Sequence, residues 1–386
     1  MHIYRYRSSG LLSQKELLYD EMYFASKEEL NDPIEMQSKF EFSDVSGVVW
    51  SRLLNELWNN AEYVKYASLY FSSKSPVTYS ELLSDFESHR ASIIRLAMES
   101  MQFQVSDFDH MESLLDKLYS FLTLYEPASG YSVSFSKSNN EMLMWSHYSG
   151  SHSGYCLIFR PINGELNQCA ERVKDRLSVS AGCFSSMPRG FKVEDVRYHN
   201  EIKEMDGFNL FPVPYTGYSF DNEVDRLKYH TDASSQLLTK NECWGYESES
   251  RLLLPQPKKW VSGESSYTPY QRIFHYDFRQ VVGVIFGARM AKNDRVNIKE
   301  IIESKLAARI SSISAKQEKD YVFDFLYQEA EICSSSRQVK INDLELVSMG
   351  RMLESGSDYY NKQLEKWKKH QGMVMESGRY SYEDIP

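Results

Sequence analysis

The hydrophobic period of the chain changes at Tyr131, and this change limits the folds that the sequence can adopt. Apolar residues recur at helical spacing in three stripes, over 48–72, 80–102 and 107–125. After Tyr131 they alternate with a period of two, which predicts strands. These strands are expected at 131–136, 154–160, 180–185, 193–198, 247–254, 271–276 and 281–286.

The start of the chain is also strand-like, so the helical block interrupts a sheet. Residues 2–7 alternate, 11–20 suggest a short helix, and 21–26 suggest a second strand. Asp107 is a suitable N-cap for the third helix. We therefore expect an α+β fold, with a mixed β-sheet domain over 1–333 and a three-helix insertion at about 46–127.

The remaining elements fit this class and not a doubly wound one. Helices are expected at 164–178, 223–239 and 297–307, without a regular βαβ spacing or a GxGxxG loop. Residues 334–386 are expected to form a C-terminal extension, with a strand at 339–347, a lysine-rich helix and a loose tail over the last ten residues.

Charge and cysteine content limit the function classes. Lys and Arg sum to 44 against 54 for Asp and Glu, which gives a net charge of −10. This disfavours non-specific coating of nucleic acid or anionic membrane, but it leaves a local basic site open. The first ten residues lack an apolar signal region, the near-apolar run at 281–291 is too short to span a bilayer, and the five cysteines form no CxxC pair. We expect a cytoplasmic protein.

Residues 140–154 form the densest motif of the sequence. The stretch 150–154 resembles a GxSxG elbow, but its central residue is His152, so the hydrolase nucleophile is absent. His147 and His152 are five residues apart, which does not favour a helical metal site, and no metal is expected. Two interpretations stay open: His147 and Tyr148 bond to the backbone at a turn, or they line a polar ligand pocket. We expect both side chains to be substantially buried and to lie near Asn31 and Asp32, because polar groups that are buried at breaks in regular structure need partners.

Residues 240–252 form the second motif. If 247–252 is a strand, Glu247, Glu249 and Arg251 share one face, and Lys240 and Arg251 can neutralise the two carboxylates. This is either a solvated strand face with salt bridges or a carboxylate pair for acid–base work or oxocarbenium stabilisation.

Other polar residues recur on the expected strands. Arg5 and Arg7 alternate with Tyr4 and Tyr6, and Ser132, Ser134 and Ser136 share one strand face. Asn31-Asp32 before Pro33 is typical of an Asx turn.

Together these motifs resemble a widespread bacterial family catalogued as a domain of unknown function (number 2971), over residue 1 to about 290. The resemblance implies a bacterial cytoplasmic protein of accessory genomic regions, where anti-phage and toxin-like effectors are frequent. The motifs are Tyr4-Arg-Tyr-Arg7, Tyr23-Phe-Ala-Ser26, Asn31-Asp32-Pro33, Met144-Trp145-x-His147-Tyr148 with His152-x-Gly154, and Lys240-x-x-x-Trp244-x-x-Glu247-x-Glu249-x-Arg251.

The order of three of these motifs is also similar to that of arginine-class ADP-ribosyltransferases, which place Arg, Ser and Glu-x-Glu on successive strands. By this resemblance, Arg5 or Arg7 anchors the NAD pyrophosphate and Ser134 positions a glutamate. Glu249 stabilises the ribosyl oxocarbenium, and Glu247 orients the acceptor. The middle strand lacks the Ser-Thr-Ser of that family, and the helical block stretches the spacing.

The primary hypothesis is an effector enzyme that acts on NAD or another nucleotide as a substrate, with no permanently bound cofactor and a protein partner or phage as its trigger. One alternative is a nucleic-acid-processing or RNA-binding effector that uses His147 and His152. Another is a non-catalytic sensor or protein-interaction module. Convergence of Arg5 or Arg7, His147 and Glu249 on one pocket would favour an enzyme.

The candidate catalytic residues are Glu249, Glu247 and His147, and the candidate cofactor-binding residues are Arg5, Arg7, Asn31, Asp32, Ser134, Tyr148, His152, Lys240, Trp244 and Arg251.

Overall fold

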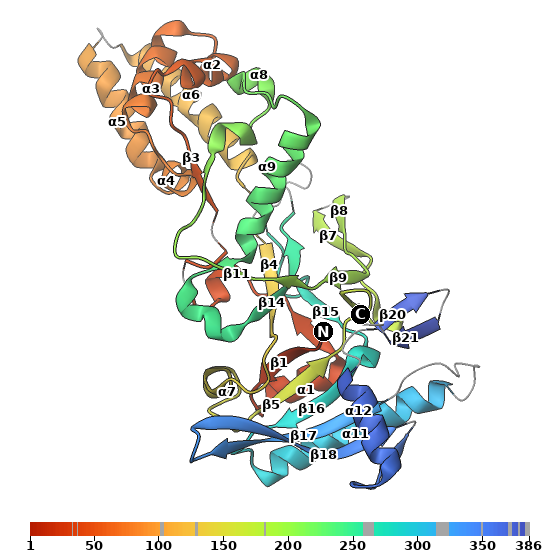
Figure 1. Ribbon diagram of the computed structural model, residues 1–386. Helices are drawn as coiled ribbons and strands as arrows, with labels where there is room; N and C mark the ends of the chain where they lie inside the picture. The colour runs from red at the N-terminus through yellow and green to blue at the C-terminus, as the bar shows by residue number, and fades with distance from the viewer. Residues whose placement is uncertain are drawn as a thin grey trace.

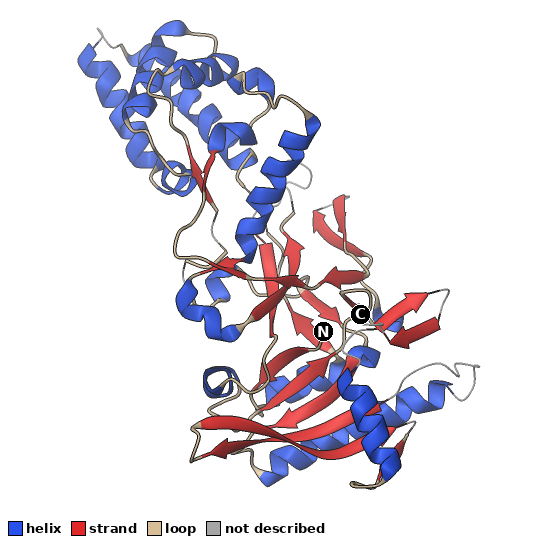
Figure 2. Ribbon diagram, in the orientation of Figure 1, coloured by secondary structure: helices blue, strands red, loops and turns tan. Residues whose placement is uncertain are grey.

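A computed structural model of the chain has a helical body at one end and a sheet body at the other (Figure 1). It describes residues 1–32, 34–36, 38–100, 104–127, 130–180, 183–257, 266–313, 324–348, 350–369, 373–376 and 379–382. A block of helices packs apart from the sheet, and the sheet itself pairs mainly antiparallel (Figure 2), so the predicted α+β class is confirmed.

The sheet body is built on a nine-stranded mixed sheet. Its strands pair antiparallel except for β16 and β17, which run parallel. In spatial order the strands are β10 (Glu194–Asp195), β14 (Glu249–Pro255), β4 (Gly130–Ser136), β1 (Ile3–Arg7), β5 (Tyr155–Phe159), β16 (Val281–Phe286), β17 (Asp324–Cys333), β18 (Gln338–Ser348) and β19 (Arg351–Leu353).

Helices cover both faces of this sheet. Alternate residues of β5 are buried on opposite faces: Leu157 packs in one hydrophobic cluster and Ile158 in another. The first cluster includes α1 (Leu11–Tyr19) and α11 (Lys292–Ile313), and the second includes α7 (Met142–Tyr148) and α12 (Asp358–Lys369). The two-sided cover explains why the central strands are apolar almost throughout.

The strands β1 and β4 are neighbours in the sheet, but they separate along most of their length. β1 pairs with β5 along its whole length, and β14 pairs with β4 from Glu249↔Ser136 to Pro255↔Gly130. In contrast, β1 and β4 share the single pair Tyr4↔Ser136. The unpaired stretch of these two neighbouring strands leaves room for a pocket.

The helical body contains five helices where the sequence indicated three stripes. They are α2 (Val48–Leu57), α3 (Ala61–Ser73), α4 (Tyr79–Ser84), α5 (Phe86–Ser100) and α6 (Val105–Leu124). Asn60 divides the first stripe because its side chain caps the backbone amides that begin α3. The N-cap prediction for Asp107 is wrong: α6 begins two residues earlier, and Asp107 accepts a hydrogen bond from the Gln104 amide at 2.8 Å.

The core of the helical body takes in more of the chain than the expected insertion at 46–127. Phe40 and Phe42 join it from β3 (Lys39–Glu41) and the residues after it, and Met205 joins it from β12 (Glu204–Asp206). β3 and β12 pair in parallel. The chain then continues through α8 (Val213–Thr216) and α9 (Glu223–Ser235), and α9 leads back to the sheet body (Figure 1).

The helix expected at 164–178 is wrong. This stretch contains β6 (Glu165–Asn167), the 3-10 turn η2 (Ala170–Arg172) and β7 (Arg176–Ser180). Asn163 and Gly164 both have left-handed backbone angles, with φ of 52° and 74°, and they link the bridged residues Ile162 and Glu165. An Asn-Gly pair of this kind is a hairpin signal, and it outweighs the apolar spacing.

Short strand pairs complete the sheet body. The pairs are β2 (Glu21–Tyr23) with β15 (Ile273–His275), β6 with β9 (Gly190–Lys192), β7 with β8 (Cys183–Ser186), β11 (Arg197–Tyr198) with β13 (Thr239–Lys240), and β20 (Met373–Glu376) with β21 (Arg379–Tyr382). The expected division at 333/334 falls in the turn between β17 and β18, so the strand predicted at 339–347 lies within the main sheet. Across the described ranges, no helix has the length and apolar character needed to cross a membrane.

Candidate active site

A pocket of about 430 Å³ lies where β1 and β4 separate. It is lined by β1, β4, the segment between β2 and β3, α7, and the residues around β13 and η5 (Glu242–Glu247). Most of the predicted site residues line it: Arg5, Arg7, Asn31, Ser134, Tyr148, Lys240, Glu247 and Glu249. Glu16, Tyr23, Glu29, Glu35 and Ser132 line it as well and were not predicted.

One side of the pocket is a buried cluster of charges centred on Lys240. The Lys240 Nζ lies 2.6 Å from Glu247 and 3.3 Å from both Glu249 and Glu35. None of these four side chains exposes more than 5% of its surface. Buried charges are tolerated when they are paired, and a single ammonium pairs three carboxylates here.

Arg251 is the second cation of the cluster, and its side chain is fully buried. Its Nε donates to Glu249 at 2.7 Å, its Nη2 donates to Glu249 at 3.0 Å and also contacts Glu35, and its Nη1 donates to the Leu237 carbonyl at 2.9 Å. This fork geometry fixes the orientation of the Glu249 carboxylate.

The cluster holds three carboxylates against two cations, so one negative charge is in excess when all are ionised. The pKa of Glu249 is raised to about 7, mainly by burial and in part by the neighbouring Glu247. Lys240 and a hydrogen bond with Ser134 act in the opposite direction and are already included in this value. Burial also disfavours the charged form of Lys240, but Glu249 and Glu247 outweigh it and raise the Lys240 pKa. A carboxyl group that titrates near neutral pH inside a pocket is typical of catalytic sites.

Glu247 and Glu249 lie in different secondary-structure elements and not, as predicted, on one strand. Glu247 ends η5, and Ser248 has a left-handed backbone with φ of 44°, so β14 begins only at Glu249. The expectation that Glu247, Glu249 and Arg251 lie along one strand is therefore wrong for Glu247. The kink is held by the Ser136 hydroxyl, which donates to the Glu247 carbonyl at 2.7 Å.

Tyr148 extends the cluster toward the segment between β2 and β3. Its hydroxyl donates to Glu247 at 2.5 Å and accepts from the Asn31 amide at 2.7 Å. The predicted proximity of Tyr148 and Asn31 is thus confirmed. Burial and the neighbouring Glu247 raise the pKa of the Tyr148 phenol, so it remains a neutral donor.

His147 is not where the sequence analysis placed it. It is exposed and does not line the pocket, so its expected burial is wrong. Trp145 and Tyr148 lie three positions apart on the inward face of α7, and this spacing turns His147 toward solvent. The catalytic role considered for His147 has no support from this geometry.

The two arginines of β1 differ in their partners. Arg7 forms an ion pair with Glu16. Arg5 is 9% exposed and lines the pocket, and no hydrogen bond or ion pair joins its guanidinium to any residue that the structure describes. Burial lowers the pKa of Arg5 to about 10. Among the described arginines and lysines that line the pocket, Arg5 is therefore the one that remains available to an anionic ligand.

The other predicted residues lie outside the pocket lining. Asp32 is buried and accepts from the Ile34 amide at 3.0 Å, as expected for an Asx turn, whereas Pro33 lies outside the described residues. His152 is buried in a left-handed turn with φ of 69°, and burial lowers its pKa. The centre of the Trp244 ring lies 4.9 Å from the Lys240 ammonium, which is within the range of a cation–π interaction.

Glu35 is the member of the charge cluster that the sequence analysis missed. It lies on the segment between β2 and β3, and its side chain is 1% exposed. No local pattern distinguishes it, because both of its cationic partners lie more than two hundred positions along the chain.

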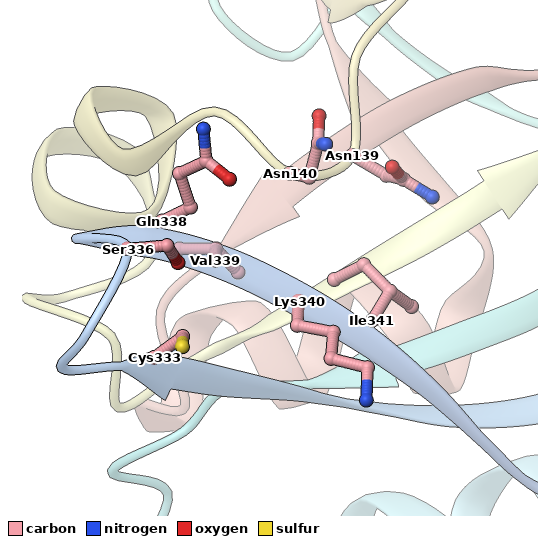
Figure 3. Close-up of a pocket in the computed structure, with 8 residues that line it drawn as sticks. All are labelled: Asn139, Asn140, Cys333, Ser336, Gln338, Val339, Lys340 and Ile341. Atoms are coloured by element: carbon pink, nitrogen blue, oxygen red, sulfur yellow. The ribbon is translucent and has the colours of Figure 1, made fainter.

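A second cavity of about 420 Å³ lies beside the hairpin of β17 and β18 (Figure 3). Its titratable thiol, Cys333, contacts the Ser335 hydroxyl at 3.1 Å, and hydrogen bonds from Ser335 and Ser336 lower its pKa to about 6. None of the predicted site residues lines it. Within the described part of the chain, no group of three or more His, Cys, Asp or Glu residues is arranged to hold a metal ion.

Comparison with known proteins gives a family for the centre of the chain. Residues 144–252 match the family described as "Protein of unknown function (DUF2971)". The predicted resemblance to this family is confirmed over residues 144–252, a shorter stretch than residue 1 to about 290. The matched stretch contains Tyr148, Lys240, Glu247, Glu249 and Arg251, but neither Arg5 nor Ser134. No curated protein and no solved structure matches the chain.

Proposed function

We propose that this chain, which resembles the DUF2971 family over residues 144–252, is an enzyme that acts on NAD or a related nucleotide in the pocket between β1 and β4. The proposed reaction is ADP-ribosyl transfer or NAD hydrolysis. The observation that carries this proposal is the presence of Arg5 and Glu249 in one pocket, on strands that flank β4 on either side. Of the three groups whose convergence was taken to favour an enzyme, the arginine and Glu249 meet in this pocket and His147 does not. The meeting of a cation and a buried carboxylate in one pocket favours an enzyme over an interaction surface.

Arg5 is suited to anchor the anionic part of the substrate. A buried arginine without a protein partner is costly to keep, so a ligand that supplies the missing oxygen atoms would be bound strongly. A pyrophosphate offers such oxygens in the geometry of the guanidinium fork. The Ser132 hydroxyl, which is buried, lines the pocket and lacks a hydrogen-bond partner in the described structure, is a further donor for the ligand.

Glu249 is suited to stabilise the positive charge that develops on the ribose. In the proposed reaction the bond between C1′ and the nicotinamide nitrogen breaks, and its electron pair leaves with nicotinamide. An acceptor hydroxyl, amine or water then attacks C1′ and loses a proton. An ionised carboxylate next to C1′ would lower the barrier electrostatically, and Arg251 holds the Glu249 carboxylate in a fixed orientation.

Glu247 is suited to orient the acceptor and to receive its proton. Its carboxylate contacts the Lys240 ammonium and the Tyr148 hydroxyl, so a proton gained there can be shared along this network. We propose further that the chain is a bacterial cytoplasmic effector of anti-phage defence or toxicity, with a protein partner or phage component as its trigger; the resemblance of residues 144–252 to the DUF2971 family supports this role.

Nicotinamide release tests the proposal. The purified chain is incubated with NAD, with and without bacterial lysate as a source of acceptors and trigger, and nicotinamide is measured by chromatography. We expect wild type to release nicotinamide and Glu249→Gln to release at least ~100-fold less, because a transition-state contact is lost. The matched control is Glu345→Gln, which removes a carboxylate that pairs with Lys299 at 2.6 Å outside the pocket.

Two results would overturn the proposal. One is that wild type neither turns over nor binds NAD under any of these conditions. The other is that Glu249→Gln and Glu345→Gln retain equal activity, since the activity would then not depend on the pocket carboxylate. Expression of wild type and Glu249→Gln in a bacterial host tests the effector role separately: toxicity in both or in neither would contradict it.

A further inference from the structure

We infer that Glu35 is a positioning residue of the candidate site, which competes with Glu249 for Arg251 and Lys240 and thereby sets the protonation state of Glu249. The inference concerns the charge balance of the cluster, and only its kinetic readout rests on the proposed function.

The first argument is that Glu35 and Glu249 share both of their cations. Arg251 Nη2 contacts both carboxylates, and Lys240 Nζ lies 3.3 Å from each of them. Neither cation can give its full interaction to Glu249 while Glu35 remains ionised. The two carboxylates also repel each other, because they are held around the same two nitrogen atoms.

The second argument is that Glu35 has no alternative partner. Its side chain is 1% exposed, and its Oε2 accepts no hydrogen bond from any described group, although it lies near Lys240. Glu29, by comparison, lines the pocket from the same segment but pairs with Arg272 at 2.7 Å. Glu35 thus adds a charge to the cluster that nothing else on its segment offsets.

The groups that face Glu249 come from every element packed against it. Ser134 and Tyr198 are neutral partners, and the Tyr198 hydroxyl accepts from the Glu249 amide at 2.7 Å. The Tyr198 pKa is raised to about 12 by burial, so this group does not titrate near neutral pH. The charged groups within ion-pair distance of the cluster are Glu35 from the β2–β3 segment, Lys240 from β13, Glu247 from η5 and Arg251 from β14. The buried Asp32, also on the β2–β3 segment, acts on Arg251 from a greater distance, and it is unchanged in every variant of the test below.

Charge counting then gives the direction of the effect. Substituting Glu35 by glutamine leaves Glu247 and Glu249 against Lys240 and Arg251, which is a balanced set. Without the competing carboxylate, ionisation of Glu249 becomes easier and its pKa falls. Removal of one neighbouring like charge typically moves a carboxyl pKa by one unit or more, roughly 1–3 units.

The test measures the titration of Glu249 directly. Protein labelled with ¹³C at the glutamate side-chain carboxyl is titrated by NMR from pH 4 to pH 9, and the Glu249 resonance is assigned by its loss in Glu249→Gln. In wild type we expect a midpoint near 7. In Glu35→Gln the midpoint is expected to fall by roughly one unit or more. The matched control Glu29→Gln, on the same segment, is expected to leave it unchanged.

Glu35→Met is the second test if Glu35→Gln does not fold. It removes the same charge with an uncharged side chain of similar volume, so the Glu249 midpoint is again expected to fall by roughly one unit or more, and an unchanged midpoint would overturn the inference. An unchanged midpoint in Glu35→Gln, or an equal fall in Glu29→Gln, would overturn the inference. If NAD is turned over, the midpoint of the pH–rate profile should move with the NMR midpoint. If the NMR midpoint moves but wild type does not act on NAD, the inference stands and the proposed function fails.

Discussion

Glu249 accepts two hydrogen bonds from Arg251, a residue only two positions further along the same strand, at 2.7 Å from Nε and 3.0 Å from Nη2. Both side chains point to one face of β14 because successive strand residues alternate. The pairing is close, yet burial still raises the Glu249 pKa to about 7. The carboxylate is therefore fixed in position by the arginine and poised between its two protonation states at physiological pH.

The first prediction concerns the separation of activity from stability in Glu249→Gln. Glutamine preserves the shape and removes the one excess negative charge, so the four remaining charged side chains are balanced. We expect NAD turnover to fall by roughly two to three orders of magnitude. The urea midpoint of Glu249→Gln should shift less than the urea midpoint of a variant that removes Lys240 or Arg251. In Glu249→Gln both buried cations keep a carboxylate partner.

The control for this first prediction is thermal melting of wild type and variant under the assay conditions. Loss of activity together with loss of the folded state would show that Glu249 is needed for folding, and its assigned role in the reaction would then have no support.

The second prediction concerns the two cations. Arg251→Met and Lys240→Met each leave three buried carboxylates with a single positive partner. Breaking a buried ion pair in this way typically costs about 3–5 kcal/mol of unfolding free energy. Urea unfolding at pH 8, where Glu249 is mainly ionised, measures this cost.

The comparison variant for the second prediction is Lys299→Met, which removes the partner of Glu345 in a partly exposed pair. Its expected cost is at most about 1 kcal/mol. A cost of the same size for Arg251→Met would mean that the cluster is hydrated rather than buried.

The predicted site residues that the structure brings into the pocket are those whose signal is local. Alternation gave the strands of Arg5, Ser134 and Glu249, and antiparallel pairing then brought β1, β4 and β14 side by side. In the same way, the spacing of Lys240 and Glu247 indicated a pair, which lies at 2.6 Å.

The features that the sequence analysis missed depend on tertiary contacts or on turn chemistry. Glu35 acquires its role only when the chain brings it to Arg251. His147 was grouped with Tyr148, although neighbouring helix positions point in different directions. Ser248 adopts a left-handed backbone that no adjacent glycine signals, and this kink moved Glu247 out of the strand. The Asn163-Gly164 turn was present as a signal but was outweighed by apolar spacing.

The third prediction is a pH dependence of stability that Glu249 alone accounts for. The folded state raises the Glu249 pKa from 4.5 to about 7, so the folded protein binds this proton more tightly than the unfolded chain. The stabilising contribution of this group is complete below the unfolded pKa and is lost as the pH rises through the folded pKa. The unfolding free energy of wild type minus that of Glu249→Gln should therefore fall between about pH 4.5 and pH 7 and then level off.

The third prediction is checked by urea titrations of both proteins at half-unit pH intervals. A difference that rises with pH over this window would mean that the folded state favours the ionised carboxylate. Activity that depends on ionised Glu249 should instead rise around the folded-state pKa of about 7.

The last prediction is that Arg5→Met raises the stability of the fold and weakens the binding of NAD. Arg5 is 9% exposed and has no hydrogen-bond or ion-pair partner within the described structure, so its buried charge is a cost to folding. Methionine fills similar volume without that charge, and we expect the unfolding free energy to rise by about 1 kcal/mol or more. NAD affinity, measured by calorimetry on the Glu249→Gln background to prevent turnover, should fall at least ~10-fold, because the anchor for the pyrophosphate is lost.

The control variant Arg7→Met breaks the pair with Glu16 instead, and it should lower the unfolding free energy. If Arg5→Met destabilises the chain and leaves NAD affinity unchanged, Arg5 is a structural residue and the anion site lies elsewhere.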